Sequence, residues 1–284
     1  MAPAARSISH HECNVAFEVP RSLTSRLIKG YKATSQYDPM KRRGLPYFAC
    51  AGILAAFLLS SFSAGFAAEP SSVSRPNQLS DGEKAAGWRL LFDGKTTKGW
   101  RNFKKLTFPE KGWVVEEGCL KHIANGGGGD IITVDQFDDF ELQWEWRIPA
   151  GANNGVKYFI TEQRASAVGH EYQMIDDVLV KDALGSTASF YEVLAPKADK
   201  PLKPPGQWNH SKILVRGNHV EHWLNGARVL EYELGSDQVK IGVAKSKFKN
   251  VEGFGTKIKG HVLLTEHHDE ASFRSIKIRE LSGK

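Results

Sequence analysis

Two carboxylates and an amide lie close together in the segment Glu171-Tyr172-Gln173-Met174-Ile175-Asp176. In a β-strand, residues i and i+2 lie on one face, so Glu171 and Gln173 are expected to share a face. Asp176 would point away in a regular strand, and we expect a β-bulge to return it to the side of Glu171. Carboxylates held together in this way can act as general acid and base. The competing interpretation is that both simply face solvent.

A second group of chemically capable residues is the run Glu266-His267-His268-Asp269. Four adjacent donors cannot all face one ion from a strand, so at most two of them would bind a divalent cation. The predicted ligand set is Glu266 and His267, with Glu171 from a neighbouring strand. An exposed hairpin tip of charged residues is the alternative.

Two isolated residues have simpler interpretations. His222 alternates with Val220 and Leu224, and a lone histidine among apolar neighbours is more often a structural residue than a catalytic one. Cys119 is the one cysteine beyond residue 68, which excludes an intramolecular disulfide framework in that part and favours a small buried side chain.

The elements that must position these groups are predicted to be β-strands. Phe140, Leu142, Trp144, Trp146 and Ile148 alternate with polar residues, as in a strand with one buried and one solvated face. The same pattern predicts strands at 155–161, 170–176, 188–194, 210–216, 219–224, 227–232 and 271–279.

Turn residues separate the predicted strands. Asn225-Gly226 predicts a two-residue hairpin, because a type I′ turn needs positive φ at both central positions. The run 126–129 of four glycines is expected to be a loop, because it lacks the strand-to-helix context of a phosphate-binding motif. Many short strands with irregular loops predict a sandwich or a jelly roll.

The N-terminal part of the sequence has the order of a secretory signal. Lys-Arg-Arg at 41–43 precedes an apolar stretch at 49–59, and small residues end at Ala67 and Ala68. We expect residues 1–39 to be an untranslated or disordered leader, 40–68 a signal peptide, 69–86 a tether and 87–284 the folded domain. The protein is therefore expected to be exported, to the periplasm or the cell exterior, without insertion in the membrane after cleavage.

Removal of the signal changes the meaning of the net charge of +6. Of the 38 basic and 32 acidic residues, eight and three lie in residues 1–68, which leaves 30 and 29 in the exported part. A nearly balanced domain of this kind does not favour nucleic acid as a partner.

Several motifs in order resemble one family of secreted bacterial proteins, the 3-keto-disaccharide hydrolase domain family, over Gly87 to Leu281. The motifs, in chain order, are Leu91-Phe92-Asp93-Gly94-Lys95, Gly99-Trp100, Asp139-Phe140-Glu141-Leu142, Asn153-Asn154-Gly155-Val156, Gly169-His170-Glu171-Tyr172-Gln173-Met174-Ile175-Asp176-Asp177, Gln207-Trp208-Asn209, Leu224-Asn225-Gly226, Gly260-His261-Val262-Leu263-Leu264, His267 and Phe273-Arg274-Ser275-Ile276. The resemblance implies an all-β, concanavalin-like jelly-roll sandwich of two curved antiparallel sheets, with a sugar groove on one concave face.

The resemblance also implies a substrate, a glycoside already oxidised to a ketone at C3. Such a ketone acidifies the proton on C2, so a base can remove it and the enolate can expel the oxygen on C1. Glu171, Asp176 and His267 are the predicted catalytic residues. The predicted substrate-binding residues are Asn154, Lys157, Gln173, Trp208, His222 and Arg274. Of these, Lys157, Gln173 or Arg274 could stabilise the enolate in place of a divalent cation.

Two other functions remain open from the sequence. The spacing Glu-x-Gln-x-x-Asp resembles the Glu-x-Asp-x-x-Glu of laminarinase-type glucanases, but Gln173 replaces the middle carboxylate, which disfavours a conventional β-glucanase. A non-catalytic carbohydrate-binding module would use the aromatic residues and need no acid or base. If the enzyme does act on oxidised glycosides, a sugar 3-oxidoreductase is the expected pathway partner.

Overall fold

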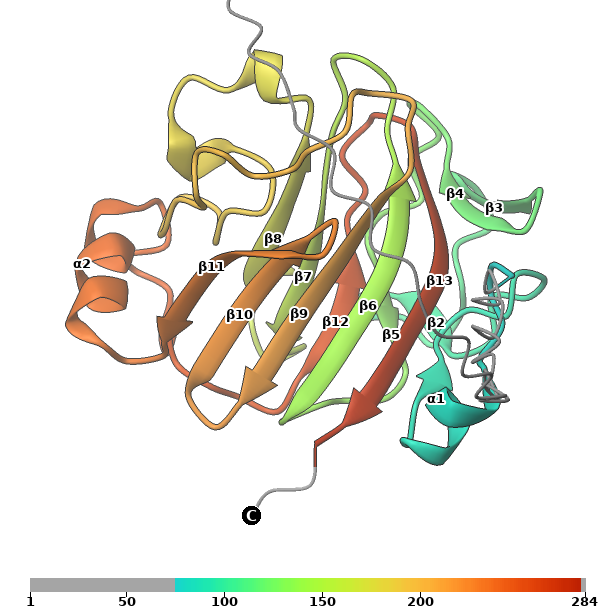
Figure 1. Cartoon of the computed structure of the whole chain (residues 1–284), viewed down its shortest axis with the longest axis horizontal. Coiled ribbons are helices and arrows are strands. Elements are labelled where there is room, and N and C mark those ends of the chain that lie inside the picture. The colour runs from blue at the N-terminus through green and yellow to red at the C-terminus, as the bar shows by residue number, and fades with distance from the viewer. Residues whose placement is uncertain (1–74, 282–284) are drawn as a thin grey trace, which may run out of the picture. The chain divides into compact units, whose positions relative to one another are not determined.

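A computed structural model describes residues 75–281 of the chain (Figure 1). Contacts divide the chain between Ala67 and Ala68, and the described residues belong to the second unit. The expected leader, the expected signal peptide and residues 69–74 of the expected tether lie outside the described residues. Within residues 75–281, no helix combines the length and the apolar character needed to cross a membrane.

Two antiparallel sheets form the described domain. Sheet A has the order β11-β10-β9-β6-β13-β4-β3, with β1 also paired to β13, and sheet B has the order β2-β5-β12-β7-β8. The strands of sheet A are β1 (Arg89–Leu90), β3 (Trp113–Glu116), β4 (Cys119–His122), β6 (Phe140–Arg147), β9 (Asn209–Arg216), β10 (His219–Leu224), β11 (Ala227–Glu233) and β13 (Ala271–Glu280). Those of sheet B are β2 (Trp100–Asn102), β5 (Ile131–Thr133), β7 (Asn153–Ile160), β8 (His170–Ile175) and β12 (His261–Leu264).

Helices are short and few in this part of the chain. They are α1 (Asp81–Ala85), the 3₁₀ turns η1 (Asp177–Leu179) and η2 (Ala183–Gly185), and α2 (Asp237–Lys245). Figure 1 shows sheet A in front of sheet B, with α2 beside the β8 side of the sandwich. The expected all-β jelly-roll sandwich is therefore confirmed.

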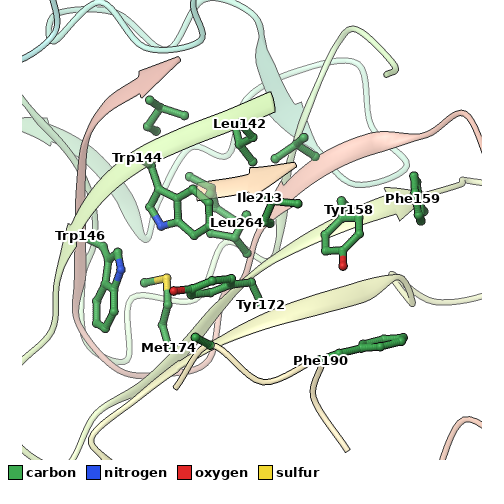
Figure 2. Close-up of a cluster of buried hydrophobic side chains, with 14 of the residues drawn as sticks. Leu142, Trp144, Trp146, Tyr158, Phe159, Tyr172, Met174, Phe190, Ile213 and Leu264 are labelled. Carbon is green, nitrogen blue, oxygen red and sulfur yellow. The ribbon is translucent and has the colours of Figure 1, made fainter. Parts of the chain in front are cut away.

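The core lies between the sheets and follows from the alternation of the strands. Trp144 and Trp146 of β6 point inward and meet Tyr172 and Met174 of β8 (Figure 2). The rings of Trp144 and Tyr172 make an edge contact with centroids 5.0 Å apart. Burial of large aromatic side chains like these supplies much of the hydrophobic stabilisation of a sandwich.

The predicted hairpin is confirmed. Leu224 pairs with Ala227, and both Asn225 and Gly226 have positive φ, 46° and 87°. Residues such as Asn and Gly tolerate this conformation at low cost. The hairpin joins β10 and β11 at the edge of sheet A.

Two local predictions were wrong. Residues 188–194 form no strand: Phe190 makes single bridges to Tyr172 and Leu194, because Ala188 and Glu192 have positive φ and interrupt the extended backbone. Part of the expected tether is ordered, since α1 begins with a capping box between Ser80 and Glu83, whose side chains bond each other's backbone.

Candidate active site

The candidate site lies on the outer face of sheet B, the face turned away from the core. In β8, Tyr172 and Met174 enter the core while Glu171 and Gln173 point outward. In β7, Val156 and Tyr158 enter the core, so Gly155 and Lys157 also face outward. The register pairs Lys157 with Glu171 and Gly155 with Gln173. Three residues predicted from the sequence, Glu171, Gln173 and Lys157, are thus brought together.

Glu171 is a buried carboxylate with few neighbouring groups that stabilise its negative charge. Its residue is 8% exposed, and the nearest cation is Lys157, with 3.9 Å between Nζ and Oε2. Within residues 75–281, no hydrogen bond reaches the carboxylate of Glu171. Burial raises the pKa of Glu171, and the charges of Lys157, Lys247 and His267 lower it in part. A carboxyl group held in this way is costly for folding and well suited to accept a proton.

Gly155 leaves the space that Glu171 occupies. A Cβ atom on Gly155 would lie 2.2 Å from Oε1 of Glu171 and 3.0 Å from its Cδ. The backbone of Gly155 has an ordinary strand conformation, so the requirement for glycine here is spatial and not conformational. The Asn-Asn-Gly motif therefore shapes the position of the candidate base.

Asn153, which was not among the predicted site residues, links the β7 side of the site to the loop after β12. Its Oδ1 accepts a hydrogen bond from Gln173 at 3.2 Å, and its Nδ2 donates to Nε2 of His267 at 3.3 Å. Its backbone N–H donates to the carboxylate of Asp269 at 2.9 Å, which fixes the loop against β7. We call Glu171, Gln173, Lys157, Asn153 and His267 the Glu171 cluster.

Asp130 is a second carboxylate near the cluster, and no sequence motif predicted it. It comes just before β5, and its Oδ1 accepts a hydrogen bond from the backbone N–H of Glu266 at 2.8 Å. Burial raises the pKa of Asp130, while the charge of Lys157 lowers it. Lys157 therefore interacts with two negative groups, Glu171 on β8 and Asp130 just before β5.

A cleft of about 370 Å³ adjoins the cluster. Asn153 and Gln173 belong both to the cluster and to the lining of the cleft. The other lining residues are Ile175, Leu179, Val180, Lys181, Asp182, Leu184, Gly185, Tyr191, Glu192, Lys245 and Ser246. A small molecule in the cleft can thus reach the cluster.

The predicted bulge that would bring Asp176 beside Glu171 was wrong. The β7–β8 register runs from Asn153↔Ile175 to Tyr158↔His170 without a shift. Asp176 follows the end of β8 and caps η1: its carboxylate accepts from the backbone N–H of Gly151 at 2.9 Å and of Val178 at 3.3 Å. Its position indicates a structural role in the loop.

Asp176→Ala is expected to lower the free energy of unfolding by about 1–3 kcal/mol, because two backbone donors near a buried side chain lose their acceptor. Asp176→Asn keeps an acceptor oxygen, so its activity is expected to stay within a few-fold of wild type. Urea unfolding and steady-state kinetics of the two variants check this. An Asp176→Asn variant that folds normally but loses turnover would instead show that Asp176 is a catalytic residue.

Two further predicted site residues lie in the interior. The side-chain amide of Asn154 is buried and bonds to Thr265: Nδ2 donates to the carbonyl oxygen, and Oδ1 accepts from the hydroxyl, both at 3.1 Å. His222 lies in the core between Tyr158 and the carbonyl of Ala188, and burial lowers its pKa to about 4. Neither side chain faces the cleft, so both predictions of substrate binding were wrong.

Trp208 and Arg274 lie on the outer face of sheet A. Arg274 donates to Glu145 of β6 at 2.8 Å, and Glu145 alternates with the core residues Trp144 and Trp146. The guanidinium of Arg274 stands 4.0 Å from the ring centroid of Trp208. Because the sandwich separates this face from Glu171, the predictions that Trp208 and Arg274 bind substrate with Glu171 were wrong.

The predicted metal ligands do not converge. In the described part of the chain, the three-residue group whose donor atoms come within 4.8 Å of one another is His219, Glu221 and Glu231 in sheet A, and not Glu171, Glu266 and His267. Glu266 instead accepts from the backbone N–H of His268 at 3.0 Å. The sheet A group already has a cation, since Arg228 contacts Glu221 and Glu231 at 2.9 and 2.7 Å.

Known proteins resemble this chain over about two thirds or more of its length. A 3-keto-disaccharide hydrolase of Bacteroides thetaiotaomicron is 32% identical over an alignment of 232 residues that covers 69% of this chain and 79% of the relative. The solved structure of a candidate glycosyl hydrolase from Parabacteroides distasonis is 31% identical, covers 73% of this chain and 100% of its own, and superposes with a TM-score of 0.67. Another from the same organism is 26% identical, covering 68% of this chain and 99% of its own, with a TM-score of 0.55.

The model of one protein family matches residues 87–279, which include the whole Glu171 cluster and all strands of both sheets except the last residue of β13. This span is more than half of the chain. The chain therefore belongs to the family of 3-keto-alpha-glucoside-1,2-lyase-like domains.

Proposed function

We propose that this protein is an exported enzyme that cleaves 3-keto-glycosides, with Glu171 as the base that removes the C2 proton. The observation that carries the proposal is the buried carboxylate of Glu171, which faces the ammonium of Lys157 beside an open cleft. Family membership supports a carbohydrate-active enzyme, and the name of the Bacteroides relative supports the oxidised substrate.

The proposed reaction has two stages. The carboxylate of Glu171 takes the proton from C2, and the electron pair of that bond forms the enolate of the C3 ketone. The enolate then collapses: a C1–C2 double bond forms, the bond from C1 to the glycosidic oxygen breaks, and the leaving oxygen takes the electron pair and a proton. Water adds to C1 and a proton returns to C2, so the net reaction is hydrolysis.

Two cluster residues have supporting roles in the proposal. Lys157 is the cation that stabilises the negative charge of the enolate, in the way fixed positive groups stabilise developing oxyanions. His267 supplies the proton to the leaving oxygen; it is exposed, and its Nε2 accepts from Asn153, which sets the orientation of the ring. Gln173 holds Asn153 in place through its side-chain amide.

Lys157→Met is expected to move the acid limb of the profile of kcat/KM against pH to higher pH. Glu171 works as a base only when deprotonated, so activity falls as the pH drops through its pKa. Lys157 now lowers that pKa, and its removal raises it further. The same variant is expected to lose activity on the plateau, because the enolate loses its cation.

A matched control for the pH profile is Lys240→Met on α2, where the lysine pairs with exposed Asp237. Its acid limb should coincide with that of wild type. An unchanged acid limb in Lys157→Met would show that Lys157 does not act on the base.

The proposal competes with a conventional β-glucanase and with a non-catalytic carbohydrate-binding module. The test is release of the aglycone from a 3-keto-glucoside, from its unoxidised parent and from β-glucan polymers, with and without a chelator. We expect release from the ketone alone, in the presence of chelator as well. Cleavage of the polymers would favour the glucanase, and binding without release would favour the binding module. Loss of aglycone release in the presence of chelator would show that a divalent cation, and not Lys157, stabilises the enolate.

The export part of the proposal rests on the sequence of residues 40–68. The substrate would then be oxidised by a separate sugar 3-oxidoreductase. N-terminal sequencing of protein recovered outside the cytoplasm should give a chain that starts near Ala68 or Glu69; a chain that retains residues 40–68 would contradict a cleaved signal.

A further inference from the structure

The outward residues of sheet B form rows that cross the sheet from strand to strand, because paired residues of neighbouring strands lie side by side. One row contains Glu171, which pairs with Lys157, and Lys157 pairs with Leu263. Leu263 in turn pairs with Ile132. These two apolar side chains are fully buried in a small cluster against which Phe103 packs. A sugar at Glu171 and Lys157 therefore cannot extend further along this row.

The neighbouring row ends in a carboxylate, that of Asp130. It runs from Gln173 to Gly155, and the carbonyl of Gly155 accepts from the backbone N–H of Thr265 at 3.2 Å. The register of β5 and β12, continued by one residue, places Thr265 opposite Asp130. Asp130 is two positions before the outward residue Ile132 and shares its face. Because Gly155 has no side chain and that of Thr265 is buried, Asp130 is the next accessible polar group after Gln173.

The carboxylate of Asp130 is held by one oxygen and leaves the other for a ligand. Its Oδ1 accepts from the backbone N–H of Glu266 at 2.8 Å. In the described part of the chain no donor bonds to Oδ2, and this oxygen is not one of the unpartnered polar atoms sealed in the interior. The charged groups that act on Asp130 include Lys157 and His267 of the Glu171 cluster. An accessible acceptor oxygen in this place suits a hydroxyl group of the substrate.

The proposed reaction determines which part of the sugar reaches Asp130. It places C2 at Glu171 and the C3 oxygen at Lys157. The oxygen on C1 lies at His267, whose partner Asn153 lines the cleft next to β8. C1 and C4 are opposite corners of a pyranose ring, so C4 points away from the cleft. Asp130 lies on that side, because β12 and then β5 follow β7 in the order of sheet B.

We propose that Asp130 is a specificity-determining residue whose Oδ2 accepts a hydrogen bond from the C4 hydroxyl of the 3-keto sugar. This inference rests on the proposed function of the Glu171 cluster and adds which sugars the cluster accepts. A substituent on the C4 oxygen removes the hydrogen that Asp130 accepts. The enzyme then acts on terminal 3-keto sugars with a free C4 hydroxyl, and not on sugars linked onward through C4.

The test removes the C4 hydroxyl from the ligand and the carboxylate from the protein, separately and together. Isothermal titration calorimetry compares methyl 3-keto-α-glucoside with its 4-deoxy analogue on the Glu171→Gln variant, whose turnover is expected to be strongly reduced. The 4-deoxy ligand should bind roughly 10–100-fold more weakly, the range of a hydrogen bond to a charged group. Adding Asp130→Ala should bring the two affinities to within about twofold, because the hydroxyl then has no acceptor to lose.

Asp135→Ala in the same background is the matched control. Asp135 follows β5 whereas Asp130 precedes it, and its carboxylate pairs with Arg89 at 2.9 Å. This variant should keep the full preference for the hydroxylated ligand. Any displacement of the Glu266 loop by Asp130→Ala affects both ligands alike and cancels from the ratio of their affinities.

Equal affinities of the two ligands for Glu171→Gln, or a preference that survives Asp130→Ala, would overturn the role of Asp130. Turnover of the hydroxylated ligand by wild type is measured separately. The expected preference without turnover would contradict the proposed function and still support Asp130 as a binding residue. Absence of binding by both ligands would contradict both proposals.

Discussion

Glu171→Gln is expected to lower kcat/KM for a 3-keto-glucoside by roughly 10²–10⁴-fold, the range that a positioned general base contributes. Glutamine has nearly the same shape but cannot accept the C2 proton. The measurement is the rate of aglycone release by wild type and variant under identical conditions.

The same substitution is expected to leave the fold as stable as wild type or more so. The buried carboxylate of Glu171 has no hydrogen-bond donor within residues 75–281, so its removal relieves a desolvation cost. Thermal and urea unfolding check this. Loss of activity together with loss of stability would not support the assignment of Glu171 as a base.

Glu145→Gln is the control for this experiment. Glu145 lies on the outer face of sheet A, where it accepts from Arg274 at 2.8 Å and from Ser275 at 3.1 Å. Its substitution should leave turnover unchanged. Similar losses of turnover in Glu145→Gln and Glu171→Gln would contradict a site confined to sheet B.

Gly155→Ala is expected to reduce kcat/KM by about 10²-fold, since a shift of about 1 Å in a reacting group can cost that much. The new Cβ would lie 2.2 Å from Oε1 of Glu171, so the carboxylate must move. The moving atoms are the end of a flexible side chain, and alanine suits a strand at least as well as glycine. Stability should therefore change little while activity falls.

Gly185→Ala is the matched control for the glycine experiment. Gly185 also lines the cleft, but its nearest neighbour to an added Cβ is Val180 at 3.9 Å, an ordinary contact. Its activity should remain close to that of wild type. Wild-type activity in Gly155→Ala would show that the position of the Glu171 carboxylate is not critical.

The sequence predicted the fold well because the alternation of apolar residues is explicit in the strands. In β6, the period-two pattern from Phe140 to Ile148 identifies the inward side chains, and all of them are buried. The pattern was misleading at 188–194, where the backbone turns through positive φ at Ala188 and Glu192. Apolar residues that are buried in a loop give the same signal as a strand.

The sequence predicted the centre of the site but not its boundary. Glu171, Gln173 and Lys157 share a face because β7 and β8 are neighbours, and the spacing within each strand shows which residues point the same way. Asn153 and Asn154 are adjacent, and only the phase of β7 decides which one leaves the core. The strand predicted from the sequence began at residue 155, so its alternation was not extended to these two residues.

Contacts between distant segments explain the remaining errors. Alternation shows that Arg274 lies on a solvated face, but a sandwich has two such faces, and only sheet order assigns β13 to sheet A. Asp130 reaches the loop after β12 through a contact across 136 positions of the chain. No local sequence pattern around Asp130 predicts that contact.

The most direct test of the central claim uses a 3-keto-glucoside that carries deuterium at C2. If Glu171 removes that atom, the aglycone should be released more slowly than from the protiated substrate. In ordinary water, the sugar product should also have lost its deuterium. A control incubation of the deuterated product alone measures spontaneous exchange. Release at an equal rate with the deuterium retained at C2 would show direct displacement at C1 and would contradict proton abstraction by Glu171.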